Sequence, residues 1–97
     1  MKSSHSPSTC IAFATKVLGD KWTPRLLFAL AKEGLRFCEL QTAAGGINPR
    51  TLTQRLNMLE EMKILKKTET GYELTPKGHD LVPILQQMAT WGGKYRT

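Results

Sequence analysis

The pattern of apolar and polar positions predicts five helices and one pair of strands. Apolar residues recur at helical spacing over about residues 10–18, 24–33, 37–44, 49–61 and 76–91. A capping residue followed by proline marks three helix starts, at Thr23-Pro24, Asn48-Pro49 and Thr75-Pro76. Residues 64–69 and 72–75 favour two short strands joined at Thr70-Gly71, which predicts a hairpin.

The remaining signals set the boundaries of the domain. Within the last helix, Pro83 predicts a kink or one lost backbone hydrogen bond, and Gly92-Gly93 predicts the helix end. The polar residues 1–9 predict a flexible N-terminal arm, followed by a single domain over residues 10–97. Four helices, a hairpin and a last helix predict a mainly α chain with a small β-hairpin, which is a winged helix-turn-helix.

The predicted helix over residues 49–61 has two differently equipped faces. Leu52, Leu56 and Leu59 share one face at helical spacing. The polar side carries side chains that can pair with base edges in a major groove. They are Arg50, Thr51, Thr53, Gln54 and Asn57. We interpret this segment as a recognition helix; an ordinary amphipathic helix with a solvated polar face is the alternative.

Composition narrows the choice of partners. The chain has 14 Lys and Arg against 8 Asp and Glu, a net charge of +6 and a pI of about 9.6. Such a surplus suits nucleic acid or an anionic membrane. No apolar run approaches the roughly 20 residues of a membrane span, and residues 1–9 lack the apolar segment of a signal peptide. We therefore expect a cytoplasmic protein whose partner is double-stranded DNA and not a membrane.

No arrangement of residues points to catalysis or to a metal. Cys10 and Cys38 lack the spacing of a zinc site, and His5 and His79 stand far apart. Paired carboxylates, a nucleophile with its base, and a phosphate-binding loop are also missing from the pattern. We predict no enzymatic activity, no cofactor and no metal.

Several fragments occur in an order that resembles a known family. Residues 19–23 read GDKWT, 36–40 RFCEL, 46–56 GINPRTLTQRL, 72–78 YELTPKG and 91–92 WG. Together with Cys10 they resemble the HxlR family of bacterial and archaeal transcription regulators, relatives of the MarR-type winged helices. The resemblance implies a homodimer that binds operator DNA, often controlled by a cysteine near the N-terminus. The wing tip is shorter than the Pro-containing wing common in that family, so deep insertion into a minor groove is not implied.

Basic residues beside the recognition helix are candidates for phosphate contacts, which position a protein on the duplex without reading its sequence. These candidates are Arg36, Arg55, Lys66 and Lys67. Arg55 borders the apolar face, so an internal pairing with an acidic neighbour is an equal alternative. Lys66 and Lys67 are neighbours in a strand and point to opposite faces, so we do not expect both to contact DNA equally.

Cys10 is the candidate redox or electrophile sensor. At the start of a helix, the local N–H groups and the dipole favour a thiolate. An exposed thiolate is what such a sensor needs. The alternative is a buried, inert thiol, and Ile11 stands where the family usually has proline. The effector, whether a small molecule or an oxidant, is unknown.

The two ends of the domain carry the predicted dimer interface. The apolar stripe of the last helix is broader than one small domain needs, and the resemblance favours its use in a homodimer. The predicted interface consists of Ile11, Phe13, Leu81, Leu85, Met88 and Trp91. The sequence thus predicts a dimeric regulator that binds a pseudo-palindromic operator. The alternative is a winged-helix protein-interaction module without specific DNA binding.

Overall fold

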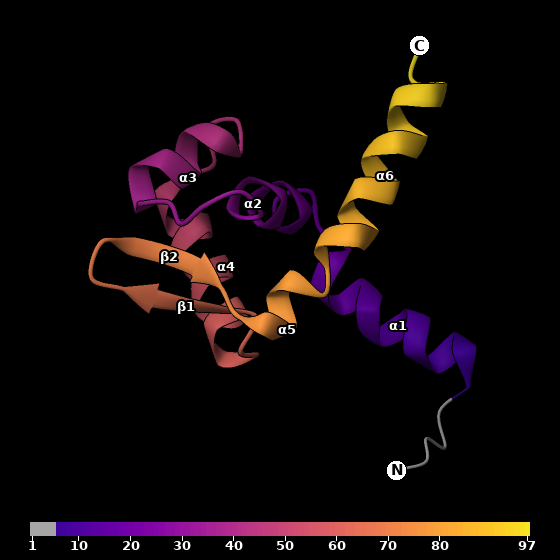
Figure 1. Ribbon diagram of the computed structural model, residues 1–97, viewed down its shortest axis with the longest axis horizontal. Coiled ribbons are helices and arrows are strands. Elements are labelled where there is room, and N and C mark those ends of the chain that lie inside the picture. Colours follow the sequence, from indigo (N-terminus) through magenta and orange to yellow (C-terminus); the bar gives the residue numbers. More distant parts are fainter. Residues whose placement is uncertain (1–5) are drawn as a thin grey trace.

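The computed structural model describes residues 6–97, in which the helices lie to one side of a single hairpin at the edge of the molecule (Figure 1). Residues 1–5, the larger part of the expected N-terminal arm, lie outside the described residues, and Pro7 to Thr9 belong to the first helix. The elements in chain order are α1 (Pro7–Leu18), α2 (Thr23–Leu30), α3 (Phe37–Ala43), α4 (Pro49–Glu61), β1 (Leu65–Thr68), β2 (Gly71–Leu74), α5 (Pro76–His79) and α6 (Val82–Tyr95).

This order of elements confirms the predicted winged helix-turn-helix. The helices α3 and α4 form the helix-turn-helix, and the antiparallel strands β1 and β2 form the wing. The segment between α2 and α3 adds a short bridge, because Leu35 pairs with Tyr72 of β2. The segment that leads into α3 therefore holds β2 close to the turn of the hairpin.

The first helix begins three residues earlier than the sequence pattern predicted. The Ser6 hydroxyl accepts a hydrogen bond from the Thr9 N–H at 3.2 Å, and Pro7 occupies the first helical position. Serine is a favoured cap and proline lacks only an N–H that has no partner there. Cys10 is consequently the fourth helical residue, and its own N–H is bonded to the Ser6 carbonyl at 3.0 Å.

Two of the three predicted caps are confirmed and one is wrong. Asn48 caps α4 and Thr75 caps α5 through their side chains. Thr23 instead lies inside the first turn of α2, fully buried. Trp22 occupies the cap position, and the side chain that binds the start of α2 is Asp20. Its carboxylate accepts from the N–H groups of Trp22 (2.8 Å) and Thr23 (2.7 Å) and from the Thr23 hydroxyl (2.7 Å).

The C-terminal segment contains two helices where the sequence pattern predicted one. A proline inside a helix clashes with the carbonyl four residues earlier, and for Pro83 that residue is His79. The chain breaks after His79, and Pro83 falls in the first turn of α6, where its missing N–H costs nothing. The predicted end at Gly92-Gly93 is also wrong, because α6 continues to Tyr95. Glycine disfavours a helix by only about 1 kcal/mol and does not by itself end one.

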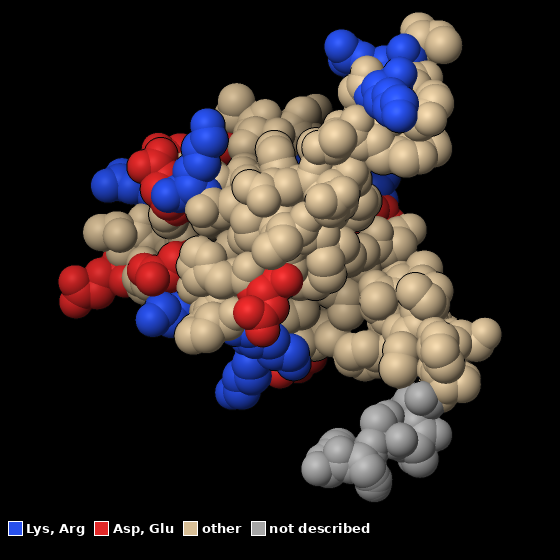
Figure 2. All heavy atoms as spheres, turned by 45° about the vertical axis from the view of Figure 1, so that its right-hand side comes forward, with Lys and Arg blue, Asp and Glu red and all other residues tan. Residues whose placement is uncertain are grey.

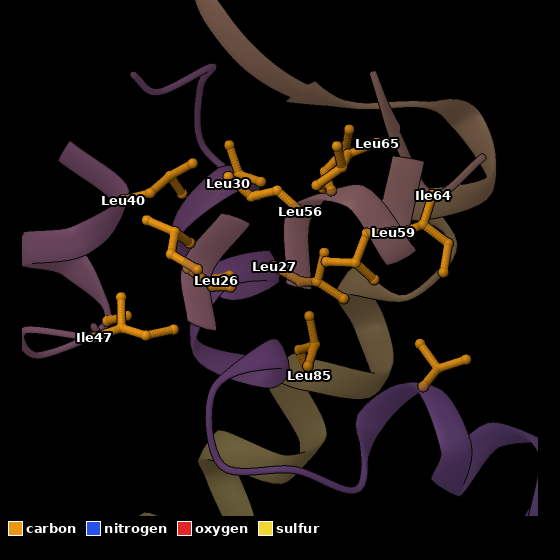
Figure 3. Packing of buried hydrophobic residues seen from close by; sticks show 14 residues of the cluster. Leu26, Leu27, Leu30, Leu40, Ile47, Leu56, Leu59, Ile64, Leu65 and Leu85 are labelled. Atoms are coloured by element: carbon orange, nitrogen blue, oxygen red, sulfur yellow. The ribbon is translucent and has the colours of Figure 1, made fainter. Parts of the chain in front are cut away.

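The hydrophobic core lies among α2, α3, α4, the wing and the start of α6. Figure 3 shows leucine and isoleucine side chains from these elements converging on one cluster. Full burial of one such side chain contributes about 1.5–3 kcal/mol. Only Val17 of α1 and Leu85 of α6 join the buried set. The rest of α1 and α6 extends away from the body as two separate arms (Figure 1).

Candidate DNA-binding surface

The helix α4 is anchored by leucines and turns a hydrogen-bonding face to solvent. Leu52, Leu56 and Leu59 are at most 1% exposed. On the other side, the four polar residues at the spacing i, i+3, i+4 and i+7 are all exposed, and they therefore share one face. They are Arg50, Thr53, Gln54 and Asn57. Thr51, the fifth predicted base contact, is half-buried at the border of this face.

The start of α4 is held firmly by its own sequence. The Asn48 side chain accepts hydrogen bonds from the N–H groups of Arg50 (2.8 Å) and Thr51 (3.3 Å). Ile47 before the cap and Leu52 in the second turn are both fully buried, as expected of a hydrophobic staple. The first turn contains no acidic residue. The end of the helix that carries Arg50 is therefore rigid and free of negative charge.

Arg55 points toward the protein. It is half-buried, and its Nη1 lies 3.9 Å from the sulfur of Met58. Its Nε is buried and has no hydrogen-bond partner among residues 6–97. Its charge also acts on Asp20. Burial would raise the pKa of Asp20, but hydrogen bonds from Thr23 and Trp22 and the positive charge of Arg55 together lower that pKa below its ordinary value. These contacts favour the internal alternative for Arg55 over a phosphate contact.

The register of the wing separates its two lysines. Lys66 is opposite Glu73 and Lys67 is opposite Tyr72. The Lys66 ammonium lies 4.0 Å from the Glu73 carboxylate, an exposed pair of the kind that contributes little to stability. Lys67 points to the other face of the hairpin, where it lines a shallow hollow with Arg36 and the wing tip. Arg36 and Lys67 are therefore neighbours, although 31 positions separate them in the sequence numbering.

A backbone bridge brings Arg36 and Lys67 together. The Leu35 N–H donates to the Tyr72 carbonyl (2.9 Å), and the Tyr72 N–H donates to the Leu35 carbonyl (2.8 Å). The close approach requires glycine at position 71, because a Cβ there would lie 2.3 Å from the Leu35 carbonyl oxygen. Gly71 also has φ +153°, which side chains rarely adopt. Glu69 is the one acidic residue lining the hollow, at the wing tip.

The two cysteines are exposed and free, on helices at different sides of the molecule. Cys10 lies on α1 and Cys38 on α3, which Figure 1 shows well apart. The buried-thiol alternative for Cys10 is therefore wrong. Its predicted place at a helix start is wrong as well, since it follows a full turn of helix. Beside Cys10 on α1, a groove is lined by Thr9, Ala12, Phe13 and Lys16.

The arms α1 and α6 expose large apolar side chains. Ile11 and Phe13 of α1 are 68% and 57% exposed, and Met88 and Trp91 of α6 are 46% and 68% exposed. The Trp91 ring contacts the Tyr95 ring in a tilted arrangement, with ring centroids 5.3 Å apart. Figure 2 shows a broad surface without charged side chains on this side of the molecule, with Lys and Arg at the free end of α6.

The predicted dimer interface is wrong at Leu85. It is 3% exposed and packs in the core, and Leu81 is half-buried against the same cluster. The exposed stripe of α6 instead contains Ile84, Met88, Trp91 and Tyr95. The sequence prediction missed Ile84 and Tyr95, although their spacing of four, three and four residues with Met88 and Trp91 is a helical signal. Phe28 of α2, 47% exposed, was missed as well.

The helix-turn-helix, the wing that the bridge joins to the segment before α3, and the exposed face of α4 define the chain as a winged helix-turn-helix protein. A family model described as HxlR-like helix-turn-helix matches residues 17–97. The chain belongs to the HxlR-like helix-turn-helix family, whose members are regulators of transcription. None of the helices over residues 6–97 combines the length and the apolar character that crossing a bilayer requires.

Individual relatives agree with this assignment. The chain is 32% identical over 94 residues to an uncharacterized HTH-type transcriptional regulator of Halalkalibacterium halodurans, covering 89% of this chain and 83% of the relative. The redox regulator HypR in its oxidized form superposes with a TM-score of 0.84 at 30% identity, covering 91% of this chain and 98% of HypR. The quinone-bound YodB from B. subtilis superposes with a TM-score of 0.79 at 28% identity, covering 89% and 98%.

Proposed function

We propose that the protein is a homodimeric transcription regulator that binds a pseudo-palindromic operator by placing α4 in the major groove. The observation that supports this most is the face of α4. Arg50, Gln54 and Asn57 are exposed on a helix whose opposite side is locked into the core. Arginine can pair with guanine, and glutamine or asparagine with adenine, at the major-groove edge. Thr53 lies on the same face, and Thr51 contributes from its border.

Arg36 and Lys67 supply the phosphate contacts in this proposal. They share one hollow beside the helix-turn-helix, so one stretch of DNA backbone can meet both charges. Lys66 has its charge paired with Glu73, and Arg55 has turned inward. We therefore assign Lys66 a minor part and Arg55 an internal one. Deep insertion of the wing is not part of the proposal, since only two residues join its strands.

The exposed apolar residues of the arms support the homodimer. Large apolar side chains that gather on an exposed surface often mark a site of protein–protein interaction. Placing two copies with their α1 and α6 arms together buries Ile11, Phe13, Met88 and Trp91 and presents two α4 helices. In helix-turn-helix dimers the two recognition helices enter successive major grooves about 34 Å apart.

A selection of bound fragments from random duplex DNA tests the proposal. Enrichment of an inverted repeat, with half-sites about one helical turn apart, is the expected result. The rival function, a protein-interaction module, predicts salt-sensitive binding to all duplexes alike and no enriched sequence. That second result would exclude sequence-specific regulation by this chain.

We further propose that reaction at the Cys10 sulfur changes operator affinity. The sulfur is exposed beside the α1 groove, on an arm that also belongs to the proposed dimer interface. The redox regulator HypR and the quinone-bound YodB share this fold. The Cys10 thiolate would add to a ring carbon of an electrophile such as a quinone. The carbon–carbon π bond opens, its electron pair moves to the carbonyl oxygen, and that oxygen takes up a proton from solvent in place of the one that the thiol gave up. Added bulk on α1 would then alter how the arms pack.

The control variants Cys10→Ser and Cys38→Ser separate the two thiols. Operator binding of the wild type and of Cys38→Ser should change after quinone treatment, and that of Cys10→Ser should not. Mass spectrometry should locate the adduct on Cys10. If Cys10→Ser responds like the wild type, the sensing role of Cys10 is wrong, and the DNA-binding proposal is unaffected.

A further inference from the structure

The turn between α3 and α4 is held from outside the helix-turn-helix by a residue of α2. The Arg25 Nη1 donates a hydrogen bond of 3.1 Å to the carbonyl oxygen of Ala44, 19 positions away in the sequence. Ala44 is fully buried and is the C-cap of α3, so its carbonyl is among those that a helix end leaves without an intrahelical partner. Arg25 satisfies that acceptor from a neighbouring helix.

The turn beneath Arg25 is built from two glycines in the left-handed region. Gly45 and Gly46 both have φ +87°, and a Cβ on Gly45 would lie 3.2 Å from the Arg25 Nη1. The Gly46 N–H donates to the Gln41 carbonyl at 2.8 Å, and the Gln41 amide donates to the Ile47 carbonyl at 3.1 Å. Two consecutive glycines have little conformational preference of their own, so contacts of this kind determine the path of the turn.

The guanidinium of Arg25 is itself held in place. Its central carbon lies 5.7 Å from the centroid of the Trp22 ring, and Trp22 is half-buried against the core. A guanidinium at this distance is attracted to the face of the ring, which favours the side-chain position from which Arg25 also binds the carbonyl. Lys21 approaches the same ring, with its ammonium 4.6 Å from the centroid. Of the two cations beside Trp22, Arg25 is the one that donates a hydrogen bond to the Ala44 carbonyl.

We propose that Arg25 is a positioning residue for the recognition helix. It fixes the α3–α4 turn, and through the turn the angle at which α4 is presented, without contacting DNA itself. This inference rests on the proposed DNA-binding function. A basic residue near a helix-turn-helix is ordinarily interpreted as a phosphate contact, and the two roles predict different results. A phosphate contact contributes to the salt dependence of binding, whereas a positioning residue acts on the free protein.

Two substitutions at Arg25 and one control distinguish these roles. Arg25→Met keeps the length and packing of the stem without donors, and Arg25→Lys keeps the charge without the planar fork. Lys21→Met removes the other cation over Trp22 and leaves the Ala44 hydrogen bond intact. The first measurement is amide hydrogen exchange of the full chain without DNA, which reports local opening. The second is the salt dependence of operator binding for the same four proteins.

We expect the Gly45 and Gly46 amides to exchange about 3–10-fold faster in both Arg25 variants, which corresponds to the loss of one hydrogen bond. The Tyr72 amide in the wing should be unchanged, and Lys21→Met should match the wild type in the turn. Operator binding should weaken about 3–10-fold in both Arg25 variants, with an unchanged slope of log K against log salt concentration.

Three results would overturn the positioning role. A slope reduced by about 0.9 in Arg25→Met and restored in Arg25→Lys would make Arg25 a phosphate contact. Unchanged exchange at Gly45 and Gly46 would show that the hydrogen bond does not hold the turn. Uniformly faster exchange throughout the chain would show a general effect on stability. If the wild type binds no operator, the proposed function fails, and the exchange data still decide whether Arg25 holds the turn.

Discussion

The body of the molecule and its two terminal arms differ in how they bury apolar residues. The body, which comprises α2, α3, α4, the wing and α5, places nearly all its leucines in one closed cluster. The arms α1 and α6 leave Ile11, Phe13 and Trp91 more than half exposed. The body therefore completes its core within one chain. The arms do not, and a second copy of the chain is the partner that we propose for them.

The difference extends to hydrogen bonding. Long-range contacts tie the body together, among them Arg25 to Ala44 and the bridge between Leu35 and Tyr72. The arms are held mainly by their own helical hydrogen bonds and by a few apolar contacts at their inner ends, where Val17 and Leu85 are the buried residues. An element with few tertiary contacts changes its position at low energetic cost. This is a suitable property for the part of a regulator that carries the candidate sensor Cys10.

The largest expected effect comes from placing charge on the arms. The double substitution Met88→Glu with Trp91→Glu introduces two carboxylates into the proposed interface, where unpaired charge is costly. We expect a folded monomer whose operator affinity falls about 1000-fold, to the range of nonspecific binding. Sedimentation gives the oligomeric state, and fluorescence anisotropy gives the affinity.

The control for this prediction is Gln86→Glu, on the opposite side of the same helix and also exposed. It should remain a dimer with nearly unchanged affinity. If the double variant is still a dimer, the arms are not the interface, and their exposed apolar residues do not serve dimerisation.

The next effect distinguishes the core of the body from the surface of the arms. Leu56→Ala removes a fully buried side chain of α4 and should lower the free energy of unfolding by about 2–5 kcal/mol. The same loss should occur in the monomeric double-glutamate background, because this core lies within one chain. Denaturant unfolding measures it.

A matched substitution on the arm is Ile84→Ala, which removes a side chain 49% exposed in the single chain. In the monomeric background it should change the free energy of unfolding by less than about 0.5 kcal/mol. Equal losses for Leu56→Ala and Ile84→Ala in that background would mean that the arm is packed in the monomer, contrary to the structure.

The sequence predicted best where the determining contacts are local. The fold order, the cap Asn48 with Pro49, and the leucine face of α4 all depend on residues within a few positions of one another. The sequence pattern predicted Thr23 as the capping side chain of α2 in place of Asp20. Both are residue types that cap helices, and only the three-dimensional geometry distinguishes them. The early start of α1 was missed because Ser6-Pro7 was assigned to a polar arm.

What could not be predicted depends on contacts between distant segments. The pairing of Leu35 with Tyr72, which brings Arg36 beside Lys67, has no signature in either segment alone. Packing against the body also decides which side of α6 faces the core. Leu85 is buried there and Ile84 is exposed, since neighbouring helical positions differ by about 100° around the axis.

Substitutions on the exposed face of α4 should have an intermediate effect on operator affinity. Gln54→Ala and Arg50→Ala should each cost about 1–3 kcal/mol at the preferred operator and little on random duplex DNA, because each removes a base contact. Competition binding with single-base operator variants measures the loss of preference. Unchanged preference in both variants would show that this face does not read bases, whatever the arms do.

A smaller effect should separate Lys67 from Lys66 on the wing. Lys67→Ala removes one proposed phosphate contact, so the slope of log K against log salt concentration should decrease by about 0.9, with every sequence weakened alike. Lys66→Ala, the matched control, breaks only the exposed pair with Glu73 and should leave the slope nearly unchanged. Equal slopes for the two variants would place the DNA backbone away from the Arg36–Lys67 hollow.

The smallest effect concerns Asp20, in the segment that joins the arm α1 to the body. Burial would raise its pKa, but the three hydrogen bonds that its carboxylate accepts and the charge of Arg55 outweigh burial and lower the pKa below its ordinary value. A pKa lowered by folding means that the ionised carboxylate stabilises the folded state. This contribution is complete above the unfolded pKa, about 3.9, and is lost as the pH falls through the lower pKa of the folded state.

Asp20→Asn should therefore lower the free energy of unfolding at pH 7 by about 0.5–1 kcal/mol, since asparagine keeps a capping oxygen but not the charge. The gap between wild type and variant should narrow as the pH falls below 4, and urea unfolding at pH 7 and pH 3 measures it. Asp80→Asn, at an exposed carboxylate after α5, serves as the control and should show no such convergence. A gap that stays constant with pH would mean that Asp20 stabilises α2 by its shape alone, and that the junction of arm and body does not depend on its charge.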